Sequence, residues 1–191
     1  MAETTDRRQV PMWYPMRISY GRDERMIRIK QQLDKEGLEN FLPMRYEYTQ
    51  TDDWDVRKKL VPAIHGLIFI RSTQDELTRL KLTRTEFTPL RYMTNLLERD
   101  NKILTVPERQ MENFMRVASV RDGSVVFLDY TDFIAKPGKE VRITQGQFAG
   151  ATGVIKRIKK SQCVVVQIKG IAAVAITFVP QAWLEEISTQ N

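Results

Sequence analysis

The chain is poor in the residues that covalent catalysis and metal binding need. Its 191 residues include one cysteine, Cys163, and one histidine, His65. A single cysteine excludes an internal disulfide, and one cysteine with one histidine cannot complete a Cys/His zinc site. The two residues are also far apart in the sequence, which argues against a nucleophilic Cys/His pair. We expect both to be packing or surface residues.

Short motifs with a known catalytic mechanism are missing as well. The sequence has no glycine-rich phosphate loop, no Gly-x-Ser-x-Gly elbow and no His-Glu-x-x-His pattern. His65, the only side chain whose ordinary pKa lies near neutrality, sits inside an apolar run without other titratable residues. We therefore predict that the protein is not an enzyme and needs no metal and no cofactor.

Long apolar runs are absent too. No window approaches the roughly 18 consecutive apolar residues of a membrane span, and the first ten residues lack the apolar stretch of a signal peptide. We expect a soluble, cytoplasmic protein that does not bind membranes. Apolar residues still make up 42% of the chain, enough for a core. The net charge of +6 favours polyanions only weakly.

The first half of the chain alternates strand and helix patterns. Residues 12–20 predict an opening strand, and Met26, Ile29 and Leu33 recur at helical spacing before Gly37. Residues 41–48 predict a second strand, residues 49–59 a mobile loop, and residues 67–70 a central strand.

Two helix starts and one further strand complete this half. Thr73 and Glu76 have the spacing of a capping box, and so do Thr105 and Glu108 ahead of a strongly amphipathic stretch. Residues 87–93 predict a strand between them. This order predicts an α/β sandwich over residues 10–120, a small and mainly antiparallel sheet with flanking helices.

The last third of the chain has a different texture. Residues 121–136 lose any period and predict a linker, in which Val125 to Phe127 are compatible with a strand or with docking on either neighbour. From residue 137 to 191 short alternating runs are broken by glycines, which predicts a small closed β-barrel. The fold class is therefore α+β, a sandwich followed by a barrel.

The start of this barrel resembles a KOW motif, the signature of small SH3-like barrels in NusG-type factors and several ribosomal proteins. The resemblance rests on residues 137–155, where Gly146 and Gly150 suit positive φ angles and Gly153 suits a close backbone approach. Phe148 is expected to plug one end of the barrel.

The front of the chain resembles the NusG N-terminal domain. Trp13 and Tyr14 open the first strand, an amphipathic helix follows at once, and residues 62–71 are similar to the family's Pro-Gly-Tyr-Val-Phe-Val strand. Together the two resemblances identify a NusG-type transcription elongation or antitermination factor. His65 and Leu67 depart from the usual proline and tyrosine, and the chain is similar in this to the specialised UpxY regulators of Bacteroides capsule operons.

The resemblance implies that the N-terminal domain binds the coiled-coil clamp helices of the largest catalytic subunit of RNA polymerase and limits pausing or termination. The positions that carry over to this apolar contact are Met16, Ile64, Leu67, Phe69 and Tyr92. Because alternate strand residues face opposite ways, each of these can equally be a core residue. The sequence does not distinguish the two.

Positive charge suggests where nucleic acid could bind. Family members approach the upstream DNA and the non-template strand near the first helix, where four arginines gather: Arg17, Arg22, Arg25 and Arg28. A solvated helix face is the alternative. In the barrel, Lys156 and Arg157 begin a cationic hairpin that either touches RNA or the ribosome or keeps the hairpin soluble.

The family's partners at the barrel are not implied for this chain. Other members use an apolar residue before a glycine to meet Rho or a ribosomal protein, and here that residue is Lys169, ahead of Gly170. The alternative function is a KOW-containing RNA-binding or ribosome-associated protein.

Overall fold

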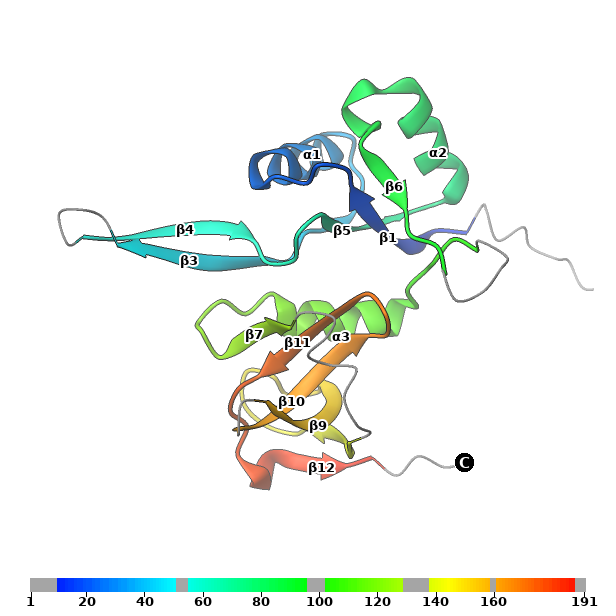
Figure 1. Ribbon diagram of the computed structural model, residues 1–191. Helices are drawn as coiled ribbons and strands as arrows, with labels where there is room; N and C mark the ends of the chain where they lie inside the picture. The colour runs from blue at the N-terminus through cyan, green and yellow to red at the C-terminus, as the bar shows by residue number, and fades with distance from the viewer. Residues whose placement is uncertain (1–9, 51–54, 96–101, 129–137, 159–160, 188–191) are drawn as a thin grey trace, which may run out of the picture. The chain divides into compact units, whose positions relative to one another are not determined.

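The computed structural model of the chain describes residues 10–50, 55–95, 102–128, 138–158 and 161–187 (Figure 1). The fold divides into two compact units, residues 1–108 and 109–191. The elements of the first unit are β1 (Met12–Ile18), α1 (Asp23–Lys35), β2 (Asn40–Phe41), β3 (Met44–Gln50), β4 (Val56–Pro62), β5 (Leu67–Ser72), α2 (Gln74–Thr83), the 3-10 turn η1 (Thr85–Phe87) and β6 (Leu90–Tyr92).

The second unit contains one helix and six strands in its described residues. They are α3 (Glu108–Ala118), whose first residue closes the first unit, then β7 (Val125–Leu128), β8 (Glu140–Ile143), β9 (Thr152–Ile158), β10 (Ser161–Ile168), β11 (Ala172–Ile176), the 3-10 turn η2 (Gln181–Trp183) and β12 (Leu184–Glu186). The predicted α+β fold class is confirmed. The domain boundaries expected from the sequence, 10–120 and 137–191 around a linker, remain a prediction.

The first unit is built on a four-stranded antiparallel sheet in the order β2-β5-β1-β6. Helices α1 and α2 pack on one face of it, and the core between them includes Met16, Ile68 and Ile70 from the strands. The expected stripe of α1 is confirmed, since Met26, Ile29 and Leu33 are its buried residues.

The capping predicted for α2 is half confirmed. Thr73 Oγ1 accepts a hydrogen bond from the amide of Glu76 over 3.2 Å, as a helix N-cap should. The carboxylate of Glu76, however, accepts from the hydroxyl of Ser72. Ser72 is buried, so this bond satisfies a polar group that would otherwise be costly to enclose.

The loop predicted for residues 49–59 is wrong at residues 49–50 and 56–59, which belong to strands, and its residues 51–54 lie outside the described residues. Strands β3 and β4 form a separate antiparallel ribbon, paired from Met44 opposite Pro62 to Gln50 opposite Val56 (Figure 1). The strand predicted for residues 41–48 is likewise divided at Pro43, with β2 in the sheet and β3 in the ribbon. Most of the ribbon is exposed, which explains why its sequence lacks an apolar period.

The second unit is a six-stranded antiparallel sheet in the order β12-β8-β9-β10-β11-β7, consistent with an SH3-like KOW domain. Strand β7, which falls within the expected linker, pairs with β11. Gly146 and Gly150 have positive φ as predicted, Gly153 approaches the carbonyl of Val165 too closely for a side chain, and Phe148 is buried. The three glycine predictions from the KOW motif are confirmed, and the place of the buried Phe148 at one end of the barrel remains a prediction.

Helix α3 packs with this second unit. Asn113 Nδ2 donates to the carbonyl of Thr152 over 2.8 Å, and Asn113 Oδ1 accepts from the Thr152 amide over 2.9 Å. Arg116 adds a bond to the carbonyl of Ala149 over 3.1 Å. The helix was expected beside the first sheet, but the side chains of Asn113 and Arg116 bond Thr152 at the start of β9 and Ala149 in the turn before it.

Candidate functional site

Two of the residues expected to contact polymerase lie on the helix-covered face of the first sheet. Met16 is opposite Ile68 on one side and Tyr92 on the other, so the three share a face. Met16 is fully buried among core residues. Tyr92 is half-buried, and its hydroxyl bonds the carbonyl of Gln74 and the hydroxyl of Thr78. Burial raises the pKa of Tyr92, as expected of a side chain that fastens α2 to the sheet.

Leu67 and Phe69 lie on the opposite face. Leu67 is paired with Arg17 and Phe69 with Pro15, whereas Met16 between them points to the helices. Both Leu67 and Phe69 have no exposed surface. The five predicted positions therefore do not form one surface, because the alternation of β1 and β5 sends them to two sides of the sheet.

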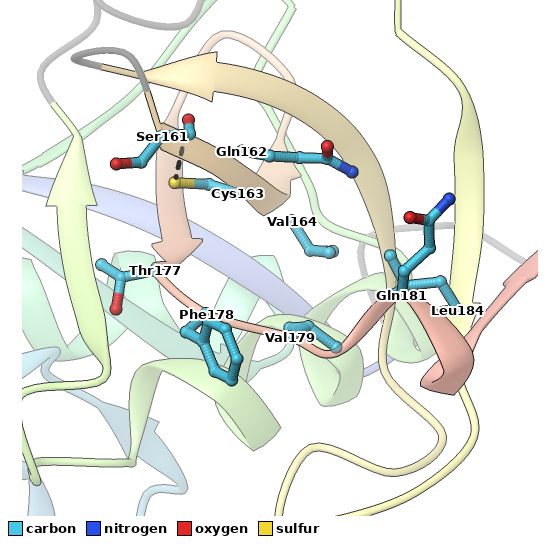
Figure 2. Close-up of a pocket in the computed structure, with 9 residues that line it drawn as sticks. All are labelled: Ser161, Gln162, Cys163, Val164, Thr177, Phe178, Val179, Gln181 and Leu184. Carbon is cyan, nitrogen blue, oxygen red and sulfur yellow. Dashed lines mark hydrogen bonds between the residues drawn. The ribbon is translucent and has the colours of Figure 1, made fainter.

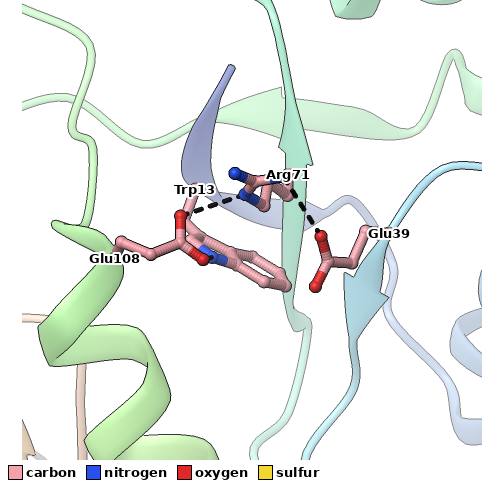
Figure 3. A network of polar contacts seen from close by, with 4 residues as sticks. All are labelled: Trp13, Glu39, Arg71 and Glu108. Carbon is pink, nitrogen blue, oxygen red and sulfur yellow. Dashed lines mark hydrogen bonds and ion pairs between the residues drawn. The ribbon is translucent and has the colours of Figure 1, made fainter.

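A polar network borders this opposite face (Figure 3). The indole of Trp13 donates to Glu108 Oε1 over 3.1 Å, and Arg71 Nε donates to Glu108 Oε2 over 3.0 Å. Arg71 also reaches Glu39 Oε2 over 3.4 Å. The hydrogen bonds from Trp13 and Arg71 hold the pKa of Glu108 below its ordinary value. The network thus fixes a carboxylate at the first residue of α3.

Ile64 lies in the turn between β4 and β5, which packs against the turn between β1 and α1. A side chain on Gly21 would come within 2.8 Å of the Gly66 Cα atom, so the two turns touch backbone to backbone. The amide of Ile18 also donates to the Gly66 carbonyl over 2.8 Å. Ile64 is half-buried and its neighbour His65 is exposed.

Two of the four predicted arginines reach these packed turns. Arg17 donates to the carbonyl of His65 over 3.2 Å, and Arg25 to the carbonyl of Ser19 over 3.1 Å. Arg22, Arg25 and Arg28 are spaced three apart at the start of α1, so they line one side of the helix, and all are exposed. The arginine surface is defined by these four residues: Arg17, Arg22, Arg25 and Arg28.

Tyr20 stands out on the first of the two turns. Its side chain is 87% exposed and its φ is +51°, a conformation that costs a residue with a β-carbon about 1–2 kcal/mol. A strained backbone that displays an aromatic ring two residues before Arg22 suits stacking on a planar cation or base. The opening strand predicted for residues 12–20 ends at Ile18, so Tyr20 lies in the turn that follows it.

Comparison with protein families identifies the family of this chain and a motif in its last third. The family described as "Transcription termination factor nusG" matches residues 11–115, more than half of the chain. The chain belongs to the NusG family. A KOW motif matches residues 137–169, in the order expected from the sequence.

Other comparisons add little to the NusG assignment. A solved structure described as "Domain interaction in Thermotoga maritima NusG" is 17% identical, with a TM-score of 0.47, and covers 95% of this chain and 99% of that one. A similarity this low gives no information about the function of this chain. A search of curated proteins found no match.

The separate β3–β4 ribbon of the first unit displays aromatic and basic side chains. The ammonium of Lys58 lies 3.7 Å from the ring centre of Tyr46 and 5.9 Å from that of Tyr48. Tyr48 is 63% exposed and Val56 64%. Tyr46, Tyr48, Val56 and Lys58 share one face of the ribbon, which is partly apolar and exposed.

The part of the chain that the structure describes contains no group of three or more His, Cys, Asp or Glu residues able to hold a metal. Cys163 is buried, and burial raises the pKa of its thiol, so the reactive thiolate is disfavoured. None of the described helices is long and apolar enough to cross a membrane.

In the turn between β10 and β11, Lys169 is exposed and Gly170 has positive φ.

Proposed function

We propose that this protein is a transcription elongation factor that binds RNA polymerase through its first unit and limits pausing or termination. The observation that carries the proposal is the family match over residues 11–115 followed by the KOW motif at 137–169. NusG-family factors are regulators without catalysis of their own. Such a protein acts by binding one conformation of polymerase better than another.

The proposed docking surface is the face of the first sheet that carries Leu67 and Phe69, with Ile64 at its margin. Met16 and Tyr92 then support this surface from the helix-covered side and do not contact the partner. Since Leu67 and Phe69 have no exposed surface here, binding to the clamp helices of the largest subunit requires a rearrangement that uncovers them. Removing water from such apolar side chains would supply much of the affinity.

We further propose that the arginine surface contacts upstream or non-template DNA. Its four guanidinium groups are exposed or bonded to carbonyls, and Asp23 and Glu24 in the same helical turn reduce the local charge. Contact with phosphates predicts salt-sensitive binding with little sequence preference. Changing Arg25 and Arg28 to alanine should weaken DNA binding and flatten its salt dependence. Arg79 on α2 provides the matched exposed control.

An operon-specific role similar to that of the UpxY regulators is the finer proposal. It is supported by the two departures from the usual family residues, His65 and Leu67, which lie in and next to the β4–β5 turn. A specialised factor should act only where a signal in the transcript or the DNA recruits it.

In vitro transcription with the host polymerase tests the proposal. On a template carrying the protein's own operon leader, the protein should reduce pausing or termination, and an unrelated leader should respond less. Co-purification with polymerase should be lost in Ile64→Ser and retained in Leu82→Ser, a control on α2 whose side chain is 82% exposed. An unchanged transcription pattern together with no co-purification would refute polymerase binding.

An RNA-binding or ribosome-associated protein is the second candidate. The KOW motif and the charge of residues 138–191, seven Lys or Arg against three Glu for a net +4, favour it. Co-sedimentation with ribosomes in the absence of polymerase binding would identify this function. Co-purification with polymerase alone would exclude it as the main role.

A further inference from the structure

The second unit has a pocket of about 350 Å³ where β10 begins (Figure 2). Strand β10 pairs with β9 from Ser161 onward but with β11 only from Val164, because β11 ends opposite it at Ile176. The chain then leaves the sheet until β12, which pairs with β8. The start of β10 therefore lacks a neighbour on its β11 side, and the pocket occupies that space.

The walls of the pocket combine an aromatic ring with amide groups and carry no charge. Its lining residues are Ser161, Gln162, Cys163, Val164, Thr177, Phe178, Val179, Gln181 and Leu184. Cys163 and Val164 are buried, whereas Phe178 is 76% exposed. Figure 2 shows Gln162 and Gln181 extending from β10 and from the segment after β11. An uncharged pocket of this kind suits a flat, neutral ligand with hydrogen-bonding edges.

One exposed cation, Arg157, is the neighbour of a lining residue of the pocket. In the β9–β10 register Gln162 is opposite Arg157, so their side chains are neighbours on one side of the sheet. Arg157 is exposed and makes no ion pair with the residues that the structure describes. Arg157 can therefore attract an anion toward the neutral pocket.

We propose that this pocket binds an unpaired nucleobase of a single-stranded nucleic acid. The base stacks on Phe178, the amides of Gln162 and Gln181 bond its edge, and Arg157 contacts the adjoining phosphate. We favour a nucleobase over an extended peptide because Arg157, next to Gln162, can bind the phosphate that a nucleotide carries and a peptide lacks. The site is separate from the proposed polymerase contact of the first unit.

Fluorescence anisotropy with labelled ten-nucleotide RNA, single-stranded DNA and duplex DNA tests this proposal on the full chain. Phe178→Ala should weaken binding of the single strands by about tenfold, and Phe178→Tyr should retain it. Arg157→Ala should lower the salt dependence by about one counterion, whereas Arg142→Ala, an exposed arginine of β8, should not. Because Phe178 is exposed, its loss should leave the fold intact.

The arms of the experiment separate the possible outcomes. Equal binding of RNA and DNA single strands would assign recognition to the base alone, and a preference for RNA would add a contact to the 2′-hydroxyl. Equal affinity for duplex, or an unchanged affinity in Phe178→Ala, would overturn the proposal. So would nucleotide-induced NMR shifts that spare Gln162 and Gln181. Co-purification with polymerase should be unaffected by Phe178→Ala, which keeps this result distinct from the proposed function.

Discussion

Trp13 and Glu108 are joined by a hydrogen bond of 3.1 Å although 95 residues separate them in the chain. Trp13 belongs to the first strand and is almost fully buried, and Glu108 is the residue at which α3 begins. The bond therefore ties the start of the sheet to the end of the first unit. Arg71, on the strand beside Trp13, holds the other oxygen of the same carboxylate.

We expect Glu108→Ala to lower the free energy of unfolding by about 1 kcal/mol, because it leaves the indole N–H of Trp13 without its acceptor. Glu108→Gln keeps an oxygen for the indole and should cost less. Urea unfolding of the two variants measures the difference. If both variants cost the same, the indole bond contributes nothing and only the charge of Glu108 matters.

Acid should weaken the same network. The pKa of Glu108 in the folded protein is below the ordinary 4.5, through its hydrogen bonds from Trp13 and Arg71. Its ionised form therefore adds stability that is complete above about pH 4.5 and is lost as the pH falls through the folded pKa. Wild type and Glu108→Gln, unfolded at a series of pH values, should differ near neutrality and converge in acid. A constant difference would contradict the assignment.

Asn113 should be the most sensitive polar residue of α3. Its amide bonds both the N–H and the carbonyl of Thr152, which Asn113→Ala would leave unpaired. We expect a loss of about 2 kcal/mol in the free energy of unfolding of the second unit. Gln110, whose bond to the Gln167 carbonyl is 3.4 Å long, is the matched control and should cost less when changed to alanine. The reverse order would show that α3 is not held through Asn113.

Leu67 distinguishes a buried core residue from an exposed binding residue. Because its side chain is fully enclosed, we expect Leu67→Ala to cost about 2–5 kcal/mol and Leu67→Asp to unfold the first unit. Circular dichroism and thermal unfolding measure both effects. A Leu67→Asp protein that folds normally but fails to bind polymerase would show that Leu67 is accessible in solution.

The Tyr20→Gly variant should be more stable than the Tyr20→Ala variant. The φ of +51° at Tyr20 is strained for any residue with a β-carbon, and glycine alone avoids that strain. We expect the free energy of unfolding to be about 1 kcal/mol higher in Tyr20→Gly than in Tyr20→Ala. Both variants remove the ring, so equal losses of single-stranded DNA binding in the two would assign that binding to the aromatic side chain. Alanine equal to glycine in stability would exclude strain at this turn.

The sequence predicted elements whose apolar pattern is complete within one segment. Met26, Ile29 and Leu33 repeat at helical spacing, and α1 buries those three. The glycines of the KOW motif predicted backbone conformation for the same reason, since a positive φ is a local property.

Features that depend on a distant partner could not be predicted in this way. Met16 and Phe69 are both apolar strand residues, and only the pairing of β1 with β5 shows that they face opposite sides. The ribbon residues Arg57 and Lys59 do not pack on a core, so their polar sequence pattern is typical of a loop although they lie in a strand. Strand β7 depends on β11, far along the chain, for its hydrogen bonds.

The contact between Gly21 and Gly66 constrains how this protein can change. Gly21 tolerates no side chain unless the Gly66 backbone withdraws, and the positive φ of Gly66 itself favours glycine, so both backbones are constrained, whereas the ring of Tyr20, one residue away, is exposed. New specificities can therefore arise on this rim by exchanging its outward side chains while the backbone beneath them stays fixed.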